Sequence, residues 1–202
     1  MSMALALASA VFIVARFGVF VALHVMNTGY NVIEHAVSDY AVGRGRRLST
    51  IASWLGAASW LTLGLAVLLG LPQWHDRVFV GVLLLVQTVI FVVLPAFPTD
   101  IEGEKLTTIG RVHYVAAIAW FAIAYALCGN FVRLFQASGP VWAYTTADIV
   151  QWVVLVSLVV LVVALIVKPL RARVFGLAER VFMLAVIVFY VVAALGVAVL
   201  VR

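Results

Sequence analysis

The stretch VVLVSLVVLVVALIV, residues 153–167, decides the fold class of this chain, because it holds a single hydroxyl and no charged side chain. Similar runs recur along the sequence. Of the 202 residues, 66% are hydrophobic and 10% are charged, and the mean hydropathy is +1.22. A soluble domain is about half apolar and about a quarter charged. The composition therefore predicts an integral membrane protein and excludes soluble, collagen-like, disordered and disulfide-rich classes.

Six segments are apolar enough to cross a membrane, for which a helix needs about 20 residues. They are about residues 4–26, 49–71, 78–97, 111–133, 147–167 and 178–201. The runs are continuous rather than alternating, which excludes a β-barrel. The first run lacks the preceding basic residues of a cleavable signal peptide and is too long for one. We therefore expect an all-α bundle of six transmembrane helices, with residues 1–202 forming a single transmembrane domain.

Basic residues are distributed unevenly between the two sides of this bundle. Nine follow the first, third and fifth segments, namely Arg44, Arg46, Arg47, Lys105, Arg111, Lys168, Arg171, Arg173 and Arg180. Three lie on the other side, namely Arg77, Arg133 and Arg202. Cytoplasmic loops carry an excess of Lys and Arg. We therefore expect the richer loops to be cytoplasmic and both termini to lie outside, in a prokaryotic inner membrane.

The net charge of +5 is then explained by topology and by contact with lipid, not by nucleic-acid binding. We expect membrane lipids as partners, with anionic headgroups at Arg44, Arg46 and Arg47. The sequence leaves open whether the chain also forms a homo-oligomer or joins a membrane complex.

The first cytoplasmic loop predicts a short amphipathic helix at about residues 31–42. At 100° per residue, one arc of this helix carries Asn31, Glu34, His35, Ser38 and Asp39. The opposite arc is apolar, so we expect the helix to lie in the membrane interface. Its polar face is either a solvated surface or an acid–base or metal-binding group.

The third loop adds polar residues on the same side. Three carboxylates precede the fourth segment, namely Asp100, Glu102 and Glu104. Thr107 or Thr108 can cap the following helix, and His113 lies in its first turn. A helix N-terminus favours neutral imidazole, the form that accepts a proton or binds a metal. Alternatively, Asp100 is a turn residue and His113 bonds only to loop backbone.

Arg16 lies near the middle of the first segment, where inserting an arginine costs about 2.5–3.5 kcal/mol. It should therefore face the bundle interior and find a partner there. Candidate partners are Glu34, Asp39, Gln87, Thr88, Asp148 and Gln151. The arginine is either an internal structural clamp or a contact for a substrate or lipid headgroup.

No cofactor is expected. None of the four histidines lies deep in a span, so the sequence does not favour a haem. A zinc site, if present, would use His35, Asp39, Asp100 and His113, because imidazole and carboxylate groups suit zinc. No closely spaced histidine pair supports it. Gly-rich phosphate loops, nucleophile elbows and C-x-x-C motifs are absent from the sequence.

Three short motifs carry a resemblance to a known family. They are Ser38-Asp39 after the first span, Phe97-Pro98 with Asp100 after the third, and Gly110 with His113 at the start of the fourth. With these motifs the chain resembles bacterial and archaeal six-span proteins catalogued as domain of unknown function 998. The resemblance implies a topology and site positions, but no reaction.

A more distant similarity is to membrane hydrolases that include alkaline ceramidases and adiponectin-type receptors. Those proteins use one Ser, one Asp and three His around zinc. Ser38, Asp39 or Asp100, and His113 would correspond to part of that set. The further histidine pair near the C-terminus is absent here, which puts a zinc amidase of that kind in doubt.

Three functions follow from these observations. We favour a binding or transport module that holds a lipid headgroup or small solute at Arg16, Glu34, Asp39, Asp100 and His113. The alternative is a membrane-embedded, metal-dependent lipid hydrolase, with catalytic candidates His35, Ser38, Asp39, Asp100 and His113. The third is a structural subunit that docks through its fifth and sixth spans. Whether the chain is an enzyme stays open, because no complete catalytic set is visible.

Overall fold

The computed structural model describes residues 1–101 and 105–201. Within them there is no strand. The six long helices are α1 Ser2–Val25, α2 Arg46–Gly70, α3 Arg77–Val93, α4 Thr108–Ser138, α5 Val141–Ile166 and α6 Lys168–Leu200. Each is long and apolar enough to cross a membrane, which confirms the predicted all-α, six-span class. Glu102, Glu104 and Arg202 lie outside the described residues.

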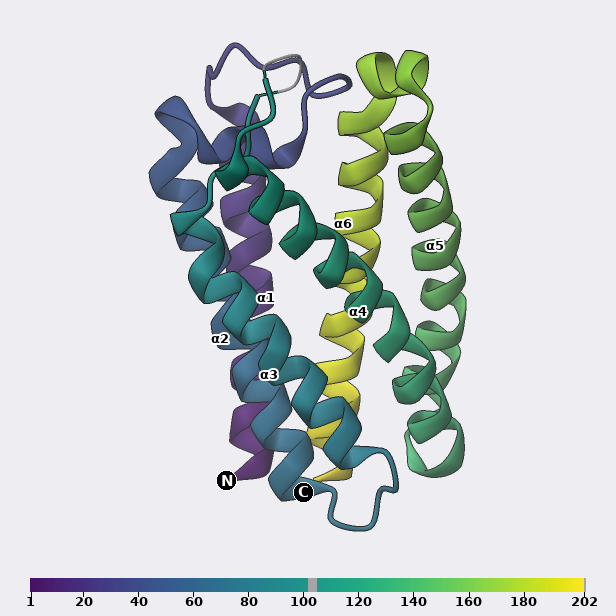
Figure 1. Ribbon diagram of the computed structural model, residues 1–202. Helices are drawn as coiled ribbons and strands as arrows, with labels where there is room; N and C mark the ends of the chain where they lie inside the picture. Colours follow the sequence, from purple (N-terminus) through teal and green to yellow (C-terminus); the bar gives the residue numbers. More distant parts are fainter. Residues whose placement is uncertain (102–104, 202) are drawn as a thin grey trace.

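Both chain ends lie at one end of the bundle, together with the α2–α3 connection (Figure 1). The α1–α2 loop, the α3–α4 loop and the α5–α6 junction lie at the other end, called here the loop end. Helix α6 packs against α1 and α5 and is the central helix. Of its most apolar stretch 67% is buried, compared with 22% for α5. Helix α4 runs obliquely across α6, from the side of α3 at the loop end toward α5.

Several helices extend beyond the apolar runs that predicted them. Helix α6 begins at Lys168 rather than at 178, so that residues 168–177 are helical and not a loop. Helix α5 begins at Val141 rather than at 147. Both starts coincide with prolines, at the N-cap position Pro140 and in the first turn at Pro169, where proline suits a helix start. Hydropathy alone misses these turns because their side chains are partly polar.

The prediction of an amphipathic α-helix at residues 31–42 is wrong. The segment contains only the short 3-10 helix η1, Val37–Ala41, after a series of turns. The Oδ2 atom of Asp39 accepts a hydrogen bond from the Ala36 amide at 3.1 Å, and the Asp39 amide donates back to the Ala36 carbonyl at 3.2 Å. Aspartate side chains that bond nearby backbone compete with α-helix formation. Asp39 is therefore buried, while Val32 and Ile33 are exposed.

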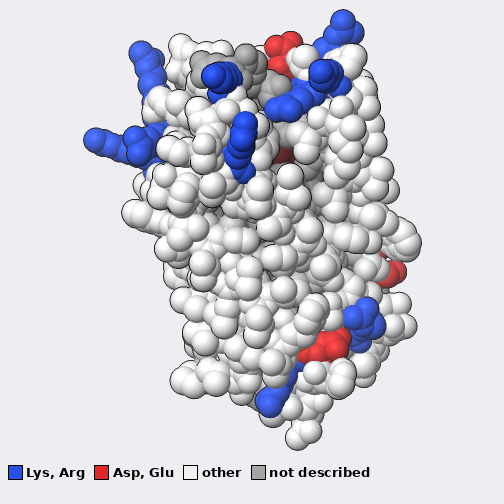
Figure 2. Space-filling view, in the orientation of Figure 1, with Lys and Arg blue, Asp and Glu red and all other residues white. Residues whose placement is uncertain are grey.

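Charged side chains gather at the two ends of the molecule (Figure 2). Most visible Lys and Arg lie at the loop end, and a broad uncharged band separates them from a smaller charged group at the other end. Two further 3-10 turns, η2 Gly43–Gly45 and η3 Leu94–Ala96, contribute to the loop end. The band is the surface expected of a chain that spans a bilayer.

Candidate functional site

A cavity of about 100 Å³ lies at the loop end, between η1 and helices α1, α2, α3, α4 and α6. Since about 10–15 Å³ can hold one water, this volume accommodates a small polar group. Its polar lining residues are Arg16, Ser38, Arg46, Ser49, Thr50, Ser53, His113 and Glu179. Apolar side chains complete the wall, among them Phe20, Phe91, Trp120 and Met183. The cavity therefore combines charged, hydroxyl and hydrocarbon surfaces.

Arg16 reaches this cavity from α1 with only 5% of its surface exposed. Its Cζ atom lies 4.8 Å from the ring centroid of Phe91 and 5.5 Å from that of Trp120, which is cation–π geometry. Gly56 of α2 makes room for this arrangement, because a Cβ there would collide with the Phe91 ring and approach the Nε atom of Arg16 to 3.4 Å. The Nη1 atom of Arg16 has no hydrogen-bond partner among the described residues.

The partners predicted for Arg16 bond elsewhere or form no hydrogen bond with it. Thr88 donates to the Leu84 carbonyl, and Asp148 accepts a hydrogen bond from Gln151. Gln87 is fully buried and forms no hydrogen bond with Arg16. Among the residues that the structure describes, the guanidinium of Arg16 thus contacts aromatic rings and no carboxylate.

Helix α6 contributes an adjacent acid and base to this end of the bundle. Glu179 lines the cavity, and its Oε2 atom accepts a hydrogen bond from the Val37 amide at 2.6 Å. Arg180 donates to the His35 carbonyl at 2.7 Å, to the Gly176 carbonyl at 2.8 Å, to His24 Nε2 at 2.7 Å and to the Tyr40 hydroxyl at 3.3 Å. These bonds hold the first loop against α6, so that η1 forms one wall of the cavity.

His113 faces the cavity from the first turns of α4. Its Nδ1 atom lies 2.8 Å from the Phe97 carbonyl oxygen, which can only accept, so Nδ1 is the donor. The Nε2 atom of a neutral imidazole is then the acceptor. A hydrogen bond to loop backbone is one of the two interpretations of His113 given above, and this bond fixes the ring in position.

Asp100 organises the start of α4 and is not among the residues that line the cavity. It accepts hydrogen bonds from the Thr107 amide at 2.7 Å and from the Thr107 hydroxyl at 2.9 Å. Thr107 is the N-cap of α4, and its Oγ1 atom accepts from the Gly110 amide at 3.0 Å. The Asp100 carboxylate occupies the space that a Cβ of residue 110 would need, so a larger residue at this position would displace Asp100.

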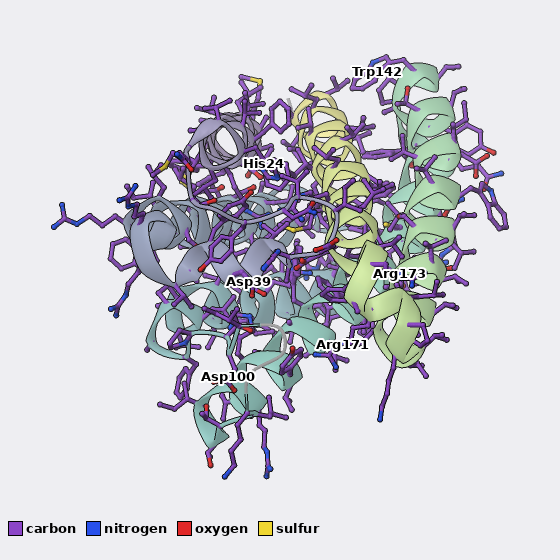
Figure 3. The ribbon with its side chains drawn as sticks, turned by 90° about the horizontal axis from the view of Figure 1, so that it is seen from above. His24, Asp39, Asp100, Trp142, Arg171 and Arg173 are labelled. Carbon is purple, nitrogen blue, oxygen red and sulfur yellow. The ribbon has the colours of Figure 1, made fainter. Side chains whose placement is uncertain are left out.

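The remaining predicted site residues are spread around the loop end. Ser38 lines the cavity, whereas Glu34 is exposed and His35 packs against the ring of Tyr30 at 5.2 Å between centroids. Viewed from above, Asp39 and Asp100 lie in different parts of the loop end (Figure 3). Within residues 1–101 and 105–201, no three His, Cys, Asp or Glu side chains form a group that could hold a metal.

Several cavity residues were not predicted, although the sequence carries a signal for some of them. Ser49, Thr50 and Ser53 follow Arg46, which was predicted only as a headgroup contact, at the spacing i, i+3, i+4, i+7 that places all four on one face of α2. Glu179 belongs to the apolar segment predicted at 178–201. Because it lies at the very start of that segment, where charges are common, the sequence carries no signal for it like that of Arg16 in mid-span.

Comparison with known proteins identifies the family. A sequence model of the family described as "Protein of unknown function (DUF998)" matches residues 6–196. The chain belongs to this family. The match runs from α1 to α6 of this DUF998 protein and confirms the resemblance expected from its motifs. Searches of the curated proteins and of the solved structures give no significant match.

Proposed function

We propose that this DUF998 protein binds an anionic group, from a lipid headgroup or a small solute, in the cavity beside Arg16. The observation that carries the proposal is Arg16, which lines the cavity and whose buried Nη1 atom has no hydrogen-bond partner among the described residues. Burying a charge without a counter-charge costs several kcal/mol, and the cation–π contacts with Phe91 and Trp120 offset only part of that cost. An anionic ligand oxygen would supply the partner that the protein itself does not.

The entrance to the cavity supports the binding of an anion. Arg46 is exposed at the loop end, and Ser49 and Ser53 follow it along one face of α2 toward Gly56. The first turn of α2 has no side-chain cap, so its backbone N–H groups add positive potential at this end. The apolar part of the lining suits the hydrocarbon next to a lipid headgroup.

The proposal is tested by measuring lipid and solute binding to purified protein with native mass spectrometry. Replacing Arg16 by leucine should weaken binding of phosphatidylglycerol about 10- to 100-fold, since hydrogen bonds to charged groups contribute about 1.5–3 kcal/mol. The variant R16K should retain part of the affinity. Arg173, an exposed arginine at the same end, provides the control variant R173L. Equal binding by R16L and the unmodified protein would contradict the proposal.

A second candidate function is hydrolysis of a membrane lipid, because Ser38 and His113 line the same cavity. With Nδ1 bonded to the Phe97 carbonyl, the Nε2 atom of His113 is the ring atom that can take a proton. Turnover of a lipid ester or amide that is abolished by H113A, with lipid binding retained, would support this function. Stoichiometric metal in the active preparation would identify a metal-dependent form.

A further inference from the structure

The cavity beside Arg16 is also lined by a buried acidic side chain. Glu179 is 6% exposed, and the described hydrogen bond of its carboxylate is the one from the Val37 amide to Oε2. Its neighbour Arg180 directs its guanidinium to His24, to Tyr40 and to two backbone carbonyls. No described residue forms an ion pair with Glu179, although the nearby charge of Arg180 stabilises its carboxylate.

Arg16 and Glu179 line the same cavity from two helices that pack against each other, α1 and α6, yet they do not form an ion pair with each other. Burying a charge without a direct ion pair is costly, and Arg180, whose guanidinium bonds to His24 and to the His35 carbonyl, compensates Glu179 only in part. A ligand that carries both charges removes the two costs at once. An anion alone would satisfy only Arg16 and would repel Glu179.

We propose that the ligand is zwitterionic, with an anionic group on Arg16 and an ammonium group on Glu179. This inference rests on the proposed function, because it names the ligand class for the same cavity. A phosphoethanolamine group has the required chemistry, since two carbons separate its phosphate from a primary ammonium. The phosphate oxygens would accept from Arg16 and from the hydroxyls on α2, and the ammonium would donate to the carboxylate of Glu179.

This arrangement predicts a ranking of headgroups. Phosphoethanolamine should bind more tightly than phosphocholine, because a trimethylammonium has no N–H to donate to Glu179. Phosphoglycerol should bind more weakly than phosphoethanolamine, because its anionic group reaches Arg16 but brings no cation to Glu179. A purely structural role of Glu179, through the Val37 amide alone, predicts no such ranking.

The experiment compares phosphatidylethanolamine, phosphatidylcholine and phosphatidylglycerol with identical acyl chains, by native mass spectrometry of the full chain. We expect the unmodified protein to prefer the ethanolamine lipid over the glycerol lipid by about tenfold. In E179Q the preference should disappear while phosphatidylglycerol still binds. Glutamine retains a carbonyl oxygen that accepts from the Val37 amide, so E179Q removes the charge and keeps the hydrogen bond. R16L should bind both lipids weakly.

The outcomes separate the two proposals. If the unmodified protein binds the ethanolamine and glycerol lipids equally, the zwitterionic ligand is ruled out while the anion site stands. The same conclusion follows if the E179Q variant still prefers the ethanolamine lipid. If R16L binds every lipid as the unmodified protein does, the anion site itself fails. The headgroup ranking of the unmodified protein decides the question even if E179Q does not fold.

A further experiment uses glycerophosphoethanolamine and glycerophosphoglycerol, which lack acyl chains. If these compounds bind with the same ranking, the ligand is a soluble zwitterion. If only the lipids bind, the ligand is a membrane lipid.

Discussion

The backbone carbonyl oxygen of His35 occupies the space where a Cβ atom of Gly176 would lie. At this contact the Nη1 atom of Arg180 donates to the carbonyls of both residues. The Leu177 amide also bonds outside its own helix, to the Ile33 carbonyl at 3.0 Å. A close approach of two backbones, possible only at glycine, thus joins the first loop to the last helix.

Replacing Gly176 by alanine should destabilise the protein. Alanine normally favours a helix over glycine by up to about 1 kcal/mol. Here its methyl group would collide with the His35 carbonyl, and overpacking typically costs about 1–3 kcal/mol, so the collision should dominate. Thermal unfolding in detergent measures the change.

Gly18 provides the matched control for this substitution, because a Cβ there meets nothing within 4 Å. G18A, in the helix α1, should be as stable as the unmodified protein or more so. A G176A variant that unfolds at the same temperature as G18A would contradict the predicted collision.

Arg180→Lys should loosen the first loop although the positive charge is kept. Lysine lacks the planar fork that lets one guanidinium bond to His24, Tyr40 and two carbonyls. Hydrogen exchange of the Val37 and Asp39 amides should become faster. R173K, at an exposed position of the same helix, is the control and should leave exchange unchanged. Unchanged protection in R180K would show that Arg180 does not hold the loop.

The sequence predicts the membrane fold well and the details of the loop end poorly. Six apolar segments are local properties of the chain, and burial in lipid requires no knowledge of what packs against what. The hydropathy pattern missed the starts of α5 at Val141 and of α6 at Lys168, because the first turns of both helices contain polar side chains. The predicted helix at 31–42 failed because Asp39 bonds to the Ala36 amide, an interaction that periodicity does not reveal.

The candidate site divides in the same way. Arg16, Ser38 and His113 were predicted and line the cavity, whereas Asp100 was predicted and serves the N-terminus of α4 instead. Glu179 lines the cavity but was not among the predicted site residues. Its neighbours in space are 142 residues away in the chain, and such long-range contacts leave no pattern in a single sequence.

The capping pair Asp100 and Thr107 should behave as one unit. D100A and T107A should each lower the free energy of unfolding by about 0.5–2 kcal/mol, the usual effect of losing a helix cap. Because Asp100 bonds to both the amide and the hydroxyl of Thr107, the double variant should lose less than the sum of the two single variants. Chemical denaturation of the four proteins in mixed micelles gives the coupling. Strict additivity would mean that the two residues act independently.

At the opposite end of the bundle, Asp76 accepts a hydrogen bond from Asn130 at 2.9 Å and forms an ion pair with Arg133 at 3.5 Å. Arg133 is exposed, and ion pairs at exposed positions contribute about 0–1 kcal/mol. Asn130 is buried, and losing a buried hydrogen bond costs about 1–3 kcal/mol. N130A should therefore lower the unfolding temperature clearly more than R133A, at low and at high salt. If R133A lowered the unfolding temperature more than N130A, the ion pair rather than the buried hydrogen bond would be the main contact that holds the α2–α3 connection.

The bond between Val37 and Glu179 also sets an order of events during biosynthesis. Ribosomes add about 5–20 residues per second, so the 142 residues between these two positions take about 7–28 s to synthesise. During that interval α1 to α5 can enter the bilayer while η1 still lacks its contact on α6. The cavity beside Arg16 is therefore completed only when the last helix arrives, and nascent chains that stall before residue 179 should be unable to hold its ligand.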